Sequence, residues 1–198
     1  MCGIFGVVAD ANKYKKTKLL QILENIAISS EVRGQDSSGI AFHNNNCKSI
    51  NVLRSPISIS KLLKSKAYQN FKKIISTSNC SSFSIIGHAR LVTNGTQLNH
   101  DNNQPVVKDG IVGVHNGIIV NDLELWKKHN DLNREFKIDT EILFSLIKKY
   151  LKNTKSFKKS IKSIKNQLKG TASIGCLFND TNQLLLYSNN GSIYILTN

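Results

Sequence analysis

The sequence predicts an α+β fold in which helices cover two antiparallel sheets. Short β-like stretches follow one another in blocks without helices between them, and consecutive strands of this kind favour antiparallel pairing. The helical stretches are grouped between these blocks. With 198 residues the chain is long enough for one sizeable core and short for two, so we expect a single domain over residues 1–198.

The first third of the chain alternates between the two kinds of element. Residues 3–9 are apolar and partly β-branched, which predicts a buried strand. Apolar residues at helical spacing predict a helix over 17–28. The turn-rich segment 33–39 leads into a strand at 40–42, and we expect 49–53 to pair with that strand as a hairpin.

The middle of the chain contains one helical stretch and two strands. Residues 58–75 have the helical pattern. Strands are expected at 83–91 and 111–114, with a polar loop over 93–104 between them.

The last third begins with helices and ends with strands. Asn121 can cap a helix that runs to about His129, and Asp139 starts a stronger helix. A third helix carries apolar residues at spacings of four, three and four, at positions 157, 161, 164 and 168. The remaining β-like stretches are residues 172–178, 183–187 and 192–196.

The composition excludes several classes of protein. The four cysteines lie far apart and form no CxxC pair, so neither a zinc site nor a disulfide framework is indicated, and scattered thiols fit a reducing cytosol. No apolar run is long enough to cross a membrane, and the N-terminus lacks the basic region of a signal peptide. We therefore expect a cytoplasmic protein without a membrane association.

The net charge of +14 has two explanations. A basic surface can attract nucleic acid, anionic lipid or an acidic protein, whereas a compositional bias toward lysine would produce the same charge without a partner. Residues 148–169 hold nine lysines and no acidic residue. Since their apolar residues keep helical spacing, we expect a solvated helix face, with docking on an acidic protein subunit as the alternative. Nucleic acid is not expected, because no binding motif accompanies the charge.

Cys2 stands directly after the initiator Met1. Cysteine is small, so we expect Met1 to be removed, leaving Cys2 with a free α-amine. The amine titrates near ~8 and the thiol near ~8.5, so one residue supplies a nucleophile and an adjacent base. A small buried residue at the start of a strand is the alternative interpretation.

Four further residues offer what attack on the amide of an amino acid requires. Asn116 and Gly117 provide a side-chain amide beside a backbone N–H, as an oxyanion hole does, although Asn-Gly also suits a plain β-turn. Arg90, at the end of a strand, can bind an α-carboxylate with two N–H groups. Asp139 can bind an α-ammonium or can simply cap its helix.

Five segments together carry a family resemblance. In chain order they are residues 2–6 (CGIFG), 33–39 (RGQDSSG), 87–95 (GHARLVTNG), 115–121 (HNGIIVN) and 139–141 (DTE). The set resembles the glutaminase domain of class II glutamine amidotransferases, which use an N-terminal nucleophile. The pattern is most like the glutaminase domains of glucosamine-6-phosphate synthase and amidophosphoribosyltransferase, and it extends from Cys2 to about residue 192.

The resemblance implies a four-layer αββα sandwich of two antiparallel sheets. It implies that Cys2 is the nucleophile and that Asn116 and Gly117 form the oxyanion hole. By the same resemblance Arg90 and Asp139 bind the α-carboxylate and α-ammonium of L-glutamine. The products are glutamate and ammonia, formed through a thioester on Cys2, and no metal or cofactor is required.

The resemblance also assigns the surroundings of the site. Residues 91–95 would begin a loop that closes over glutamine, with Leu91, Thr93 and Asn94 lining the pocket, and Arg33 would support the N-terminus. Two positions depart from the family pattern: Leu91 replaces a common aromatic residue, and Asn94 replaces a histidine of glucosamine-6-phosphate synthase. Neither departure removes a catalytic atom, but both make the acceptor of the ammonia harder to assign.

Three functional hypotheses remain. The first is a glutaminase domain or subunit that delivers ammonia to a synthase or transferase, located in a partner subunit or in a missing C-terminal domain. The second is a free-standing γ-glutamyl amidohydrolase of the same fold, and the third is a catalytically silent regulatory module. Of the histidines, His88 and His115 are expected to pack near the site, and His43, His100 and His129 are expected on the surface.

Overall fold

The strands form two facing antiparallel sheets. The computed structural model describes residues 2–47, 49–91 and 102–197. Within these residues the first sheet has the strand order β1-β4-β2-β3 and the second the order β5-β6-β7-β8. The strands of the first sheet are β1 (Gly3–Asp10), β2 (Ser37–Asn44), β3 (Asn51–Ser55) and β4 (Ser82–Arg90). Those of the second are β5 (Val106–Lys108), β6 (Ile111–Ile119), β7 (Gly170–Phe178) and β8 (Leu184–Ser188).

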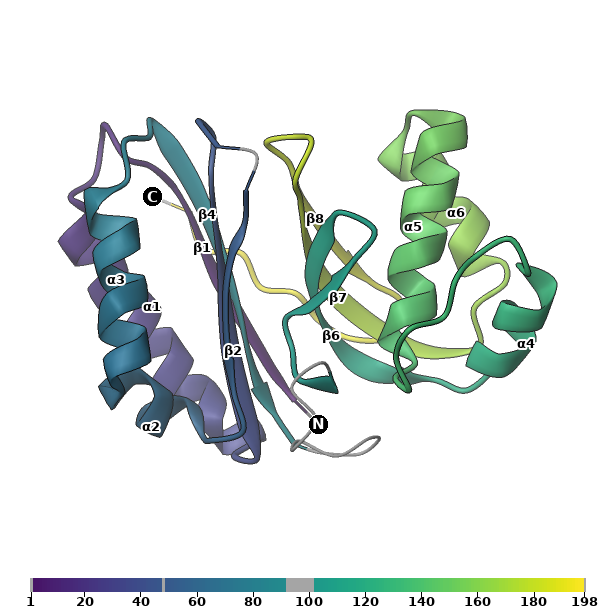
Figure 1. Cartoon of the computed structure of the whole chain (residues 1–198), viewed down its shortest axis with the longest axis horizontal. Coiled ribbons are helices and arrows are strands. Elements are labelled where there is room, and N and C mark those ends of the chain that lie inside the picture. Colours follow the sequence, from purple (N-terminus) through teal and green to yellow (C-terminus); the bar gives the residue numbers. More distant parts are fainter. Residues whose placement is uncertain (1, 48, 92–101, 198) are drawn as a thin grey trace.

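Helices cover the outer face of each sheet, which gives four layers (Figure 1). The first sheet is covered by α1 (Lys16–Ser30), α2 (Ile59–Lys64) and α3 (Lys66–Thr77), and η1 (Glu31–Arg33) follows α1. The second is covered by α5 (Thr140–Thr154) and α6 (Phe157–Lys165), with α4 (Asp122–Lys128) beside them. The predicted α+β class and the αββα sandwich are thereby confirmed.

The apolar core is divided by the sheets. One cluster fills the space between the first sheet and its helices, and a second fills the space between the second sheet and its helices. Among the described residues, the layer between the sheets holds a smaller cluster, whose buried apolar residues are Ala41, Ile86, Val112, Val114 and Leu177. Each half therefore has an apolar core of its own, and a smaller apolar cluster lies between the halves.

Residues 148–169 form the amphipathic helices that their spacing predicts. The apolar side chains of this segment pack against the second cluster, among them Tyr150, Phe157 and Ile164. Several lysines form ion pairs at the surface, such as Lys148 with Asp180 at 2.8 Å. Among the residues that the structure describes, no helix combines the length and the apolar character needed to cross a bilayer.

Two elements differ from the prediction because of local polar contacts. The helix expected over 58–75 is split at Ser65, which is extended and whose hydroxyl accepts a hydrogen bond from the backbone N–H of Tyr68 at 3.1 Å. This bond caps α3 and ends α2. The helix after Asn121 is present, but the Asn121 side chain bonds Gln167 and Lys169 instead of capping it.

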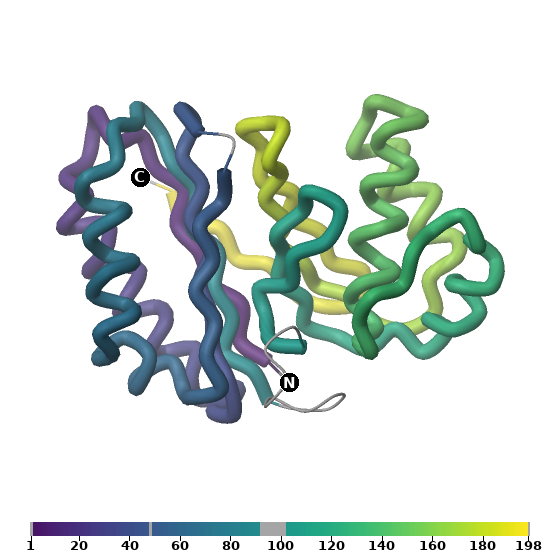
Figure 2. Tube along the Cα trace, viewed as in Figure 1, coloured from purple at the N-terminus to yellow at the C-terminus, as the bar shows by residue number. Residues whose placement is uncertain are grey.

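The prediction was wrong at two other places. A strand was expected over 192–196, but the chain is irregular there, and Tyr194 and Leu196 are 89% and 99% exposed. A β-branched stretch forms a strand only where it can pack or pair. After β8 the chain instead turns back toward the half of the molecule that holds the first sheet (Figure 2). Conversely, β5 was not expected, and it forms a hairpin with β6 through Asp109 and Gly110, whose φ values of 53° and 78° suit a tight two-residue turn.

Two histidines expected on the surface are buried. The ring of His43 bonds the Cys47 carbonyl at 2.9 Å, and the ring of His129 bonds Gln167 at 3.0 Å. Both rings can be buried because each has a hydrogen-bond partner: the Cys47 carbonyl lies four residues from His43, whereas Gln167 lies 38 residues from His129. His100 lies outside the described residues.

Candidate active site

Strand register aligns Cys2 with Arg90 on the first sheet. Gly3 pairs with Ala89, which places Cys2 opposite Arg90, and Ser37 pairs with Arg90 from the other side. Side chains alternate along a strand. Because Ile4 and Ile86 face the second sheet, Cys2 and Arg90 face it as well.

The second sheet contributes Asn116 to the same layer. Val112 and Val114 of β6 pack between the sheets, so Asn116 follows on the same face. The backbone nitrogen of Cys2 donates a hydrogen bond to Asn116 Oδ1 at 3.1 Å. Only the amide oxygen can accept, so Asn116 has its Nδ2 group left to donate to another molecule. The contact joins the two sheets at the start of β1.

Gly117 occupies a position that requires glycine. Its φ is +152°, and a Cβ atom there would lie 2.1 Å from the Thr171 carbonyl oxygen. Asn116 and Gly117 lie inside β6, so the plain β-turn is excluded. A backbone of this kind is costly for other residues and is frequent at functional sites.

The Arg90 guanidinium is buried and anchored. Its Nη1 donates to the Asn102 carbonyl at 2.8 Å and to Asn103 Oδ1 at 3.0 Å. Burial lowers the pKa of Arg90, and the charges of Cys2, Asp36 and Asp139 act in the opposite direction. The group remains cationic, since arginine does not lose its proton in proteins. A positive charge is therefore held beside Cys2 and Asp139.

Asp139 stands at the N-terminus of α5 but does not cap it. Its Oδ2 accepts a hydrogen bond from the backbone N–H of Ile119 at 2.7 Å, and it makes no capping bond to the helix. The carboxylate is thus tied to the end of β6, three residues after Asn116. The interpretation of Asp139 as a helix cap is wrong.

Five of the eight predicted site residues line one pocket. These are Cys2, Arg90, Leu91, Gly117 and Asp139, and Asn116 contacts Cys2 beside them. The volume of the pocket is about 30 Å³, room for one or two water molecules.

The remaining predictions around the pocket have different outcomes. Leu91 is half-exposed, and its carbonyl oxygen lies 3.5 Å from Cys2 Sγ. Thr93 and Asn94 lie outside the described residues. Arg33 is exposed in η1, and the segment after it reaches the site through Asp36, whose N–H donates to the Arg90 carbonyl at 3.0 Å.

The prediction for the site missed the side chains that brace it. Gln104 receives a hydrogen bond from the His115 N–H at 2.5 Å and donates one to the His115 carbonyl at 2.8 Å. Thr140 lies 2.9 Å from His115 Nδ1. The only signal for Gln104 was the run of amide side chains at 102–104 before Pro105, and polar loop residues resemble it in any sequence.

His88 and His115 are buried next to the site, as expected, and the structure favours the neutral form of both rings. His88 Nε2 lies 3.2 Å from the His115 carbonyl and must donate to it, which leaves Nδ1 without a proton. Burial lowers the pKa of His88 to about 3, and the charge of Arg90 adds to this effect. Burial also lowers the pKa of His115. Neither ring can serve as a cation at neutral pH.

Comparison with known proteins identifies a family. A family model described as "Glutamine amidotransferase domain" matches residues 88–196, more than half of the chain, and this range contains every predicted site residue except Cys2. The chain is 31% identical over 205 residues to glutamine–fructose-6-phosphate aminotransferase (isomerizing) of Helicobacter pylori, covering 99% of this chain and 30% of that protein. The same enzyme from Bartonella henselae is 30% identical over 195 residues, covering 96% of this chain and 29% of the relative.

A solved structure shows the same fold. Glutamine phosphoribosylpyrophosphate amidotransferase of B. subtilis superposes with a TM-score of 0.64 at 21% identity, covering 95% of this chain and 37% of that one. Likeness at this identity concerns the fold alone. The chain spans about 30% of the length of the curated relatives.

Proposed function

Since this chain belongs to the glutamine amidotransferase domain family, a class II family with an N-terminal cysteine nucleophile, we propose that it is the glutaminase part of such an enzyme. It hydrolyses the side-chain amide of glutamine to glutamate and ammonia, with Cys2 as nucleophile. The observation that carries the proposal is the 3.1 Å contact between the Cys2 nitrogen and Asn116, which brings a nucleophile and an amide donor together from two sheets.

The reaction proceeds in two steps. The free amine of Cys2 takes the thiol proton, and sulfur attacks the δ-carbon of glutamine. The negative oxygen accepts hydrogen bonds from Asn116 Nδ2 and the Gly117 N–H. The C–N bond then breaks, the amine returns its proton to the leaving nitrogen, and ammonia departs. Water attacks the γ-glutamyl thioester, releasing glutamate and restoring the thiol.

Two charged groups recognise the amino-acid part of the substrate. Arg90 binds the α-carboxylate and Asp139 binds the α-ammonium. The support is that both line the pocket with Cys2, that Arg90 is buried, and that each is oriented by hydrogen bonds of its own. Leu91, Thr93 and Asn94 complete the pocket in this proposal.

The mechanism requires that Met1 is removed. With Met1 attached the Cys2 nitrogen is an amide, which is not basic because its lone pair is delocalised into the carbonyl group. Met1 lies outside the described residues, so the requirement comes from the chemistry alone. The mature protein is expected to begin at Cys2.

The ammonia passes to a synthase or transferase, carried by a partner subunit or by a further domain of the same protein. The support is that the curated relatives, named as aminotransferases, are about three times longer than this chain. Residues 1–198 then act as one glutaminase domain. Glutaminase activity that rises on addition of the partner would support this part of the proposal.

The proposal is tested by covalent capture and turnover on the same samples. Intact mass first establishes that Cys2 is N-terminal. Diazo-oxo-norleucine, an electrophilic glutamine mimic, is expected to modify Cys2 and to spare the exposed Cys47. Cys2→Ala abolishes both capture and glutamate release, whereas Cys47→Ser changes neither. Glutamate release that persists in Cys2→Ala would overturn the mechanism, and a γ-glutamyl amide preferred over glutamine would favour a free-standing amidohydrolase.

A further inference from the structure

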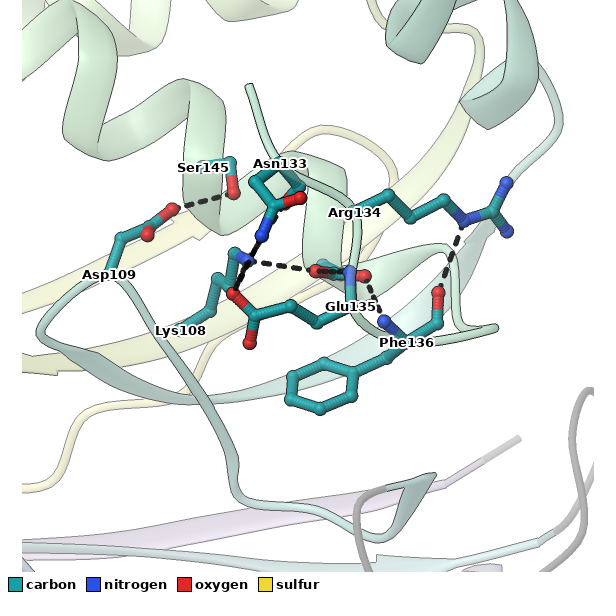
Figure 3. A network of polar contacts seen from close by, with 8 residues as sticks. Lys108, Asp109, Asn133, Arg134, Glu135, Phe136 and Ser145 are labelled. Carbon is teal, nitrogen blue, oxygen red and sulfur yellow. Dashed lines mark hydrogen bonds and ion pairs between the residues drawn. The ribbon is translucent and has the colours of Figure 1, made fainter. Parts of the chain in front are cut away.

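A buried lysine lies at the centre of a polar network that it forms with the loop at 133–136 and the first turn of α5 (Figure 3). Lys108 ends β5 and is 4% exposed. Its ammonium donates to Glu135 Oε1 at 2.6 Å, lies 3.0 Å from Glu141 Oε1, and donates to the Asn133 carbonyl at 2.8 Å. An ammonium has three N–H donors, so the full capacity of Lys108 is used on residues of one loop and one helix.

Glu141 anchors the loop in this network. It is fully buried in the first turn of α5. Its two carboxylate oxygens accept hydrogen bonds from the backbone N–H groups of Glu135 and Phe136, both at 2.7 Å. A buried carboxylate needs a counter-charge, and Lys108 supplies it. The loop at 133–136 is therefore held by its backbone.

The loop held by Lys108 and Glu141 leads directly to the substrate site. Ile138 and Asp139 follow it in the chain and line the pocket. On its other side Asp139 is tied to the Ile119 N–H. The position of the Asp139 carboxylate thus depends on one contact to β6 and on the anchored loop before it.

Lys108 also links the two segments that flank the pocket. The segment 102–108 begins at Asn102, which accepts a hydrogen bond from Arg90, and ends at Lys108. The segment 133–141 contains Asp139. One side chain therefore connects the region that orients Arg90 with the region that orients Asp139.

The ion pairs are maintained across neutral pH. Burial opposes the charge of Lys108, but the hydrogen bonds to Glu135 and Glu141, with the charges of Glu141 and Asp109, raise its pKa above the ordinary value. The bond to Lys108 lowers the pKa of Glu135. Lys108 and Glu135 therefore face each other as charged groups.

From this geometry we propose that Lys108 and Glu141 are positioning residues, which hold Asp139 at the distance from Arg90 that the α-ammonium of glutamine requires. The inference rests on the proposed function, because it assigns a task to the same site. Lys108 does not touch the substrate and acts through the loop at 133–136.

The test compares glutamine with glutaramate, which is glutamine without its α-amino group. In Lys108→Met the loop loses its anchor and Asp139 is displaced. The KM for glutamine is expected to rise about tenfold, while kcat stays within about twofold, because a contact made equally in the ground state and the transition state is lost. The kcat/KM for glutaramate should not change, because that substrate makes no contact with Asp139.

Matched variants separate positioning from stability. Lys148→Met removes a surface lysine that pairs with Asp180 from α5 and should change neither substrate's kinetics. Lys108→Arg should recover most of the KM, because it can still donate to both carboxylates. If Lys108→Met folds poorly, Lys108→Met with Glu141→Gln removes the uncompensated charge, and the same difference between substrates is expected. In an Asp139→Asn background Lys108→Met should add little.

Two results would overturn the inference. Equal losses on glutamine and glutaramate would mean that Lys108 supports the fold in general, and an unchanged KM for glutamine would mean that the network does not reach Asp139. Either result would leave the proposed function intact. Absence of glutamine hydrolysis by the unmodified chain beginning at Cys2 would instead overturn the proposed function and this inference with it.

Discussion

At the scale of single residues, the side chain of Asn116 has two roles, one as acceptor and one as donor. Its oxygen accepts the hydrogen bond from the Cys2 nitrogen, and its Nδ2 group is the one donor that remains. The two tasks can be separated by substitution, because aspartate keeps the acceptor and lacks the donor.

Asn116→Asp and Asn116→Ala are both expected to lower the kcat for glutamine by ~100–1000-fold, the typical effect of losing one oxyanion donor. The measurement is steady-state glutamate release, with circular dichroism to check that the fold is retained. If Asn116→Asp turned over normally while Asn116→Ala did not, the acceptor contact would be what matters, and the role of Asn116 as an oxyanion donor would be wrong.

His88 makes folding depend on pH. Its pKa is about 3 in the folded state and 6.5 when unperturbed. A lowered folded-state pKa means that the unfolded chain binds the proton first, so the contribution of His88 to stability is complete above pH 6.5 and decreases as the pH falls toward 3. Between pH 7 and pH 5 the loss is about 2 kcal/mol. His115, whose pKa is also lowered, acts in the same direction.

Urea unfolding at these two pH values checks the effect. The free energy of unfolding should fall by about 2 kcal/mol more in the wild type than in His88→Gln. The same pH dependence in both proteins would show that folding does not lower the pKa of His88.

At the scale of elements, β6 contains the site glycine whose backbone conformation other residues would find costly. Gly117→Ala is expected to lower the free energy of unfolding by about 2 kcal/mol or more, because the new Cβ would meet the Thr171 carbonyl at a positive φ. Gly175→Ala on the neighbouring β7 is the control. Its Cβ would find no atom nearer than 3.5 Å, so a change within about 1 kcal/mol is expected. Equal losses would mean that glycine is not required at position 117 in particular.

The elements that were predicted well have a strong apolar pattern. The helix after Asp139 needed only the spacing of its apolar residues, and the strand from Gly3 was predicted from a continuous apolar, partly β-branched run. The short β5 was missed because three residues cannot show a period, although Asp109-Gly110 after two valines is a strong hairpin signal. The strand expected at 192–196 failed for the opposite reason, since its composition is right but its side chains remain largely exposed.

The residues of the candidate site also differ in whether the sequence could predict them. Cys2, Arg90 and Asp139 could be predicted from the chemistry that an amino-acid amide demands and from the order of the motifs. Gln104 and Lys108 could not, because a polar side chain in a loop or beside a turn gives no sign that it will be buried. Their partners are 11 to 33 residues away in sequence, and only the folded chain brings them together.

At the scale of the whole molecule, the layer between the sheets, with its small apolar cluster, joins two halves that each have a core of their own. Val114 lies fully buried in this layer. Val114→Ala should lower the free energy of unfolding by about 2 kcal/mol, through lost burial and the cavity it leaves.

The fluorescence of Trp126, the single tryptophan, reports on α4 beside the second sheet, whereas circular dichroism reports on both halves. The two signals should shift together in Val114→Ala if the layer couples the halves. A shift in fluorescence alone would mean that the second half unfolds by itself.

The hydrogen bond from the Cys2 nitrogen to Asn116 has a consequence for how catalysis can be lost. The attacking sulfur belongs to one slab of the sandwich, meaning one sheet with its covering helices. The groups that would bind the negative oxygen belong to the other slab. Any agent that shifts or separates the slabs by about an ångström, such as hydrostatic pressure or dilute urea, should abolish catalysis while every helix and strand is still present. Catalysis is then a more sensitive gauge of the spacing between the slabs than any spectrum of the backbone.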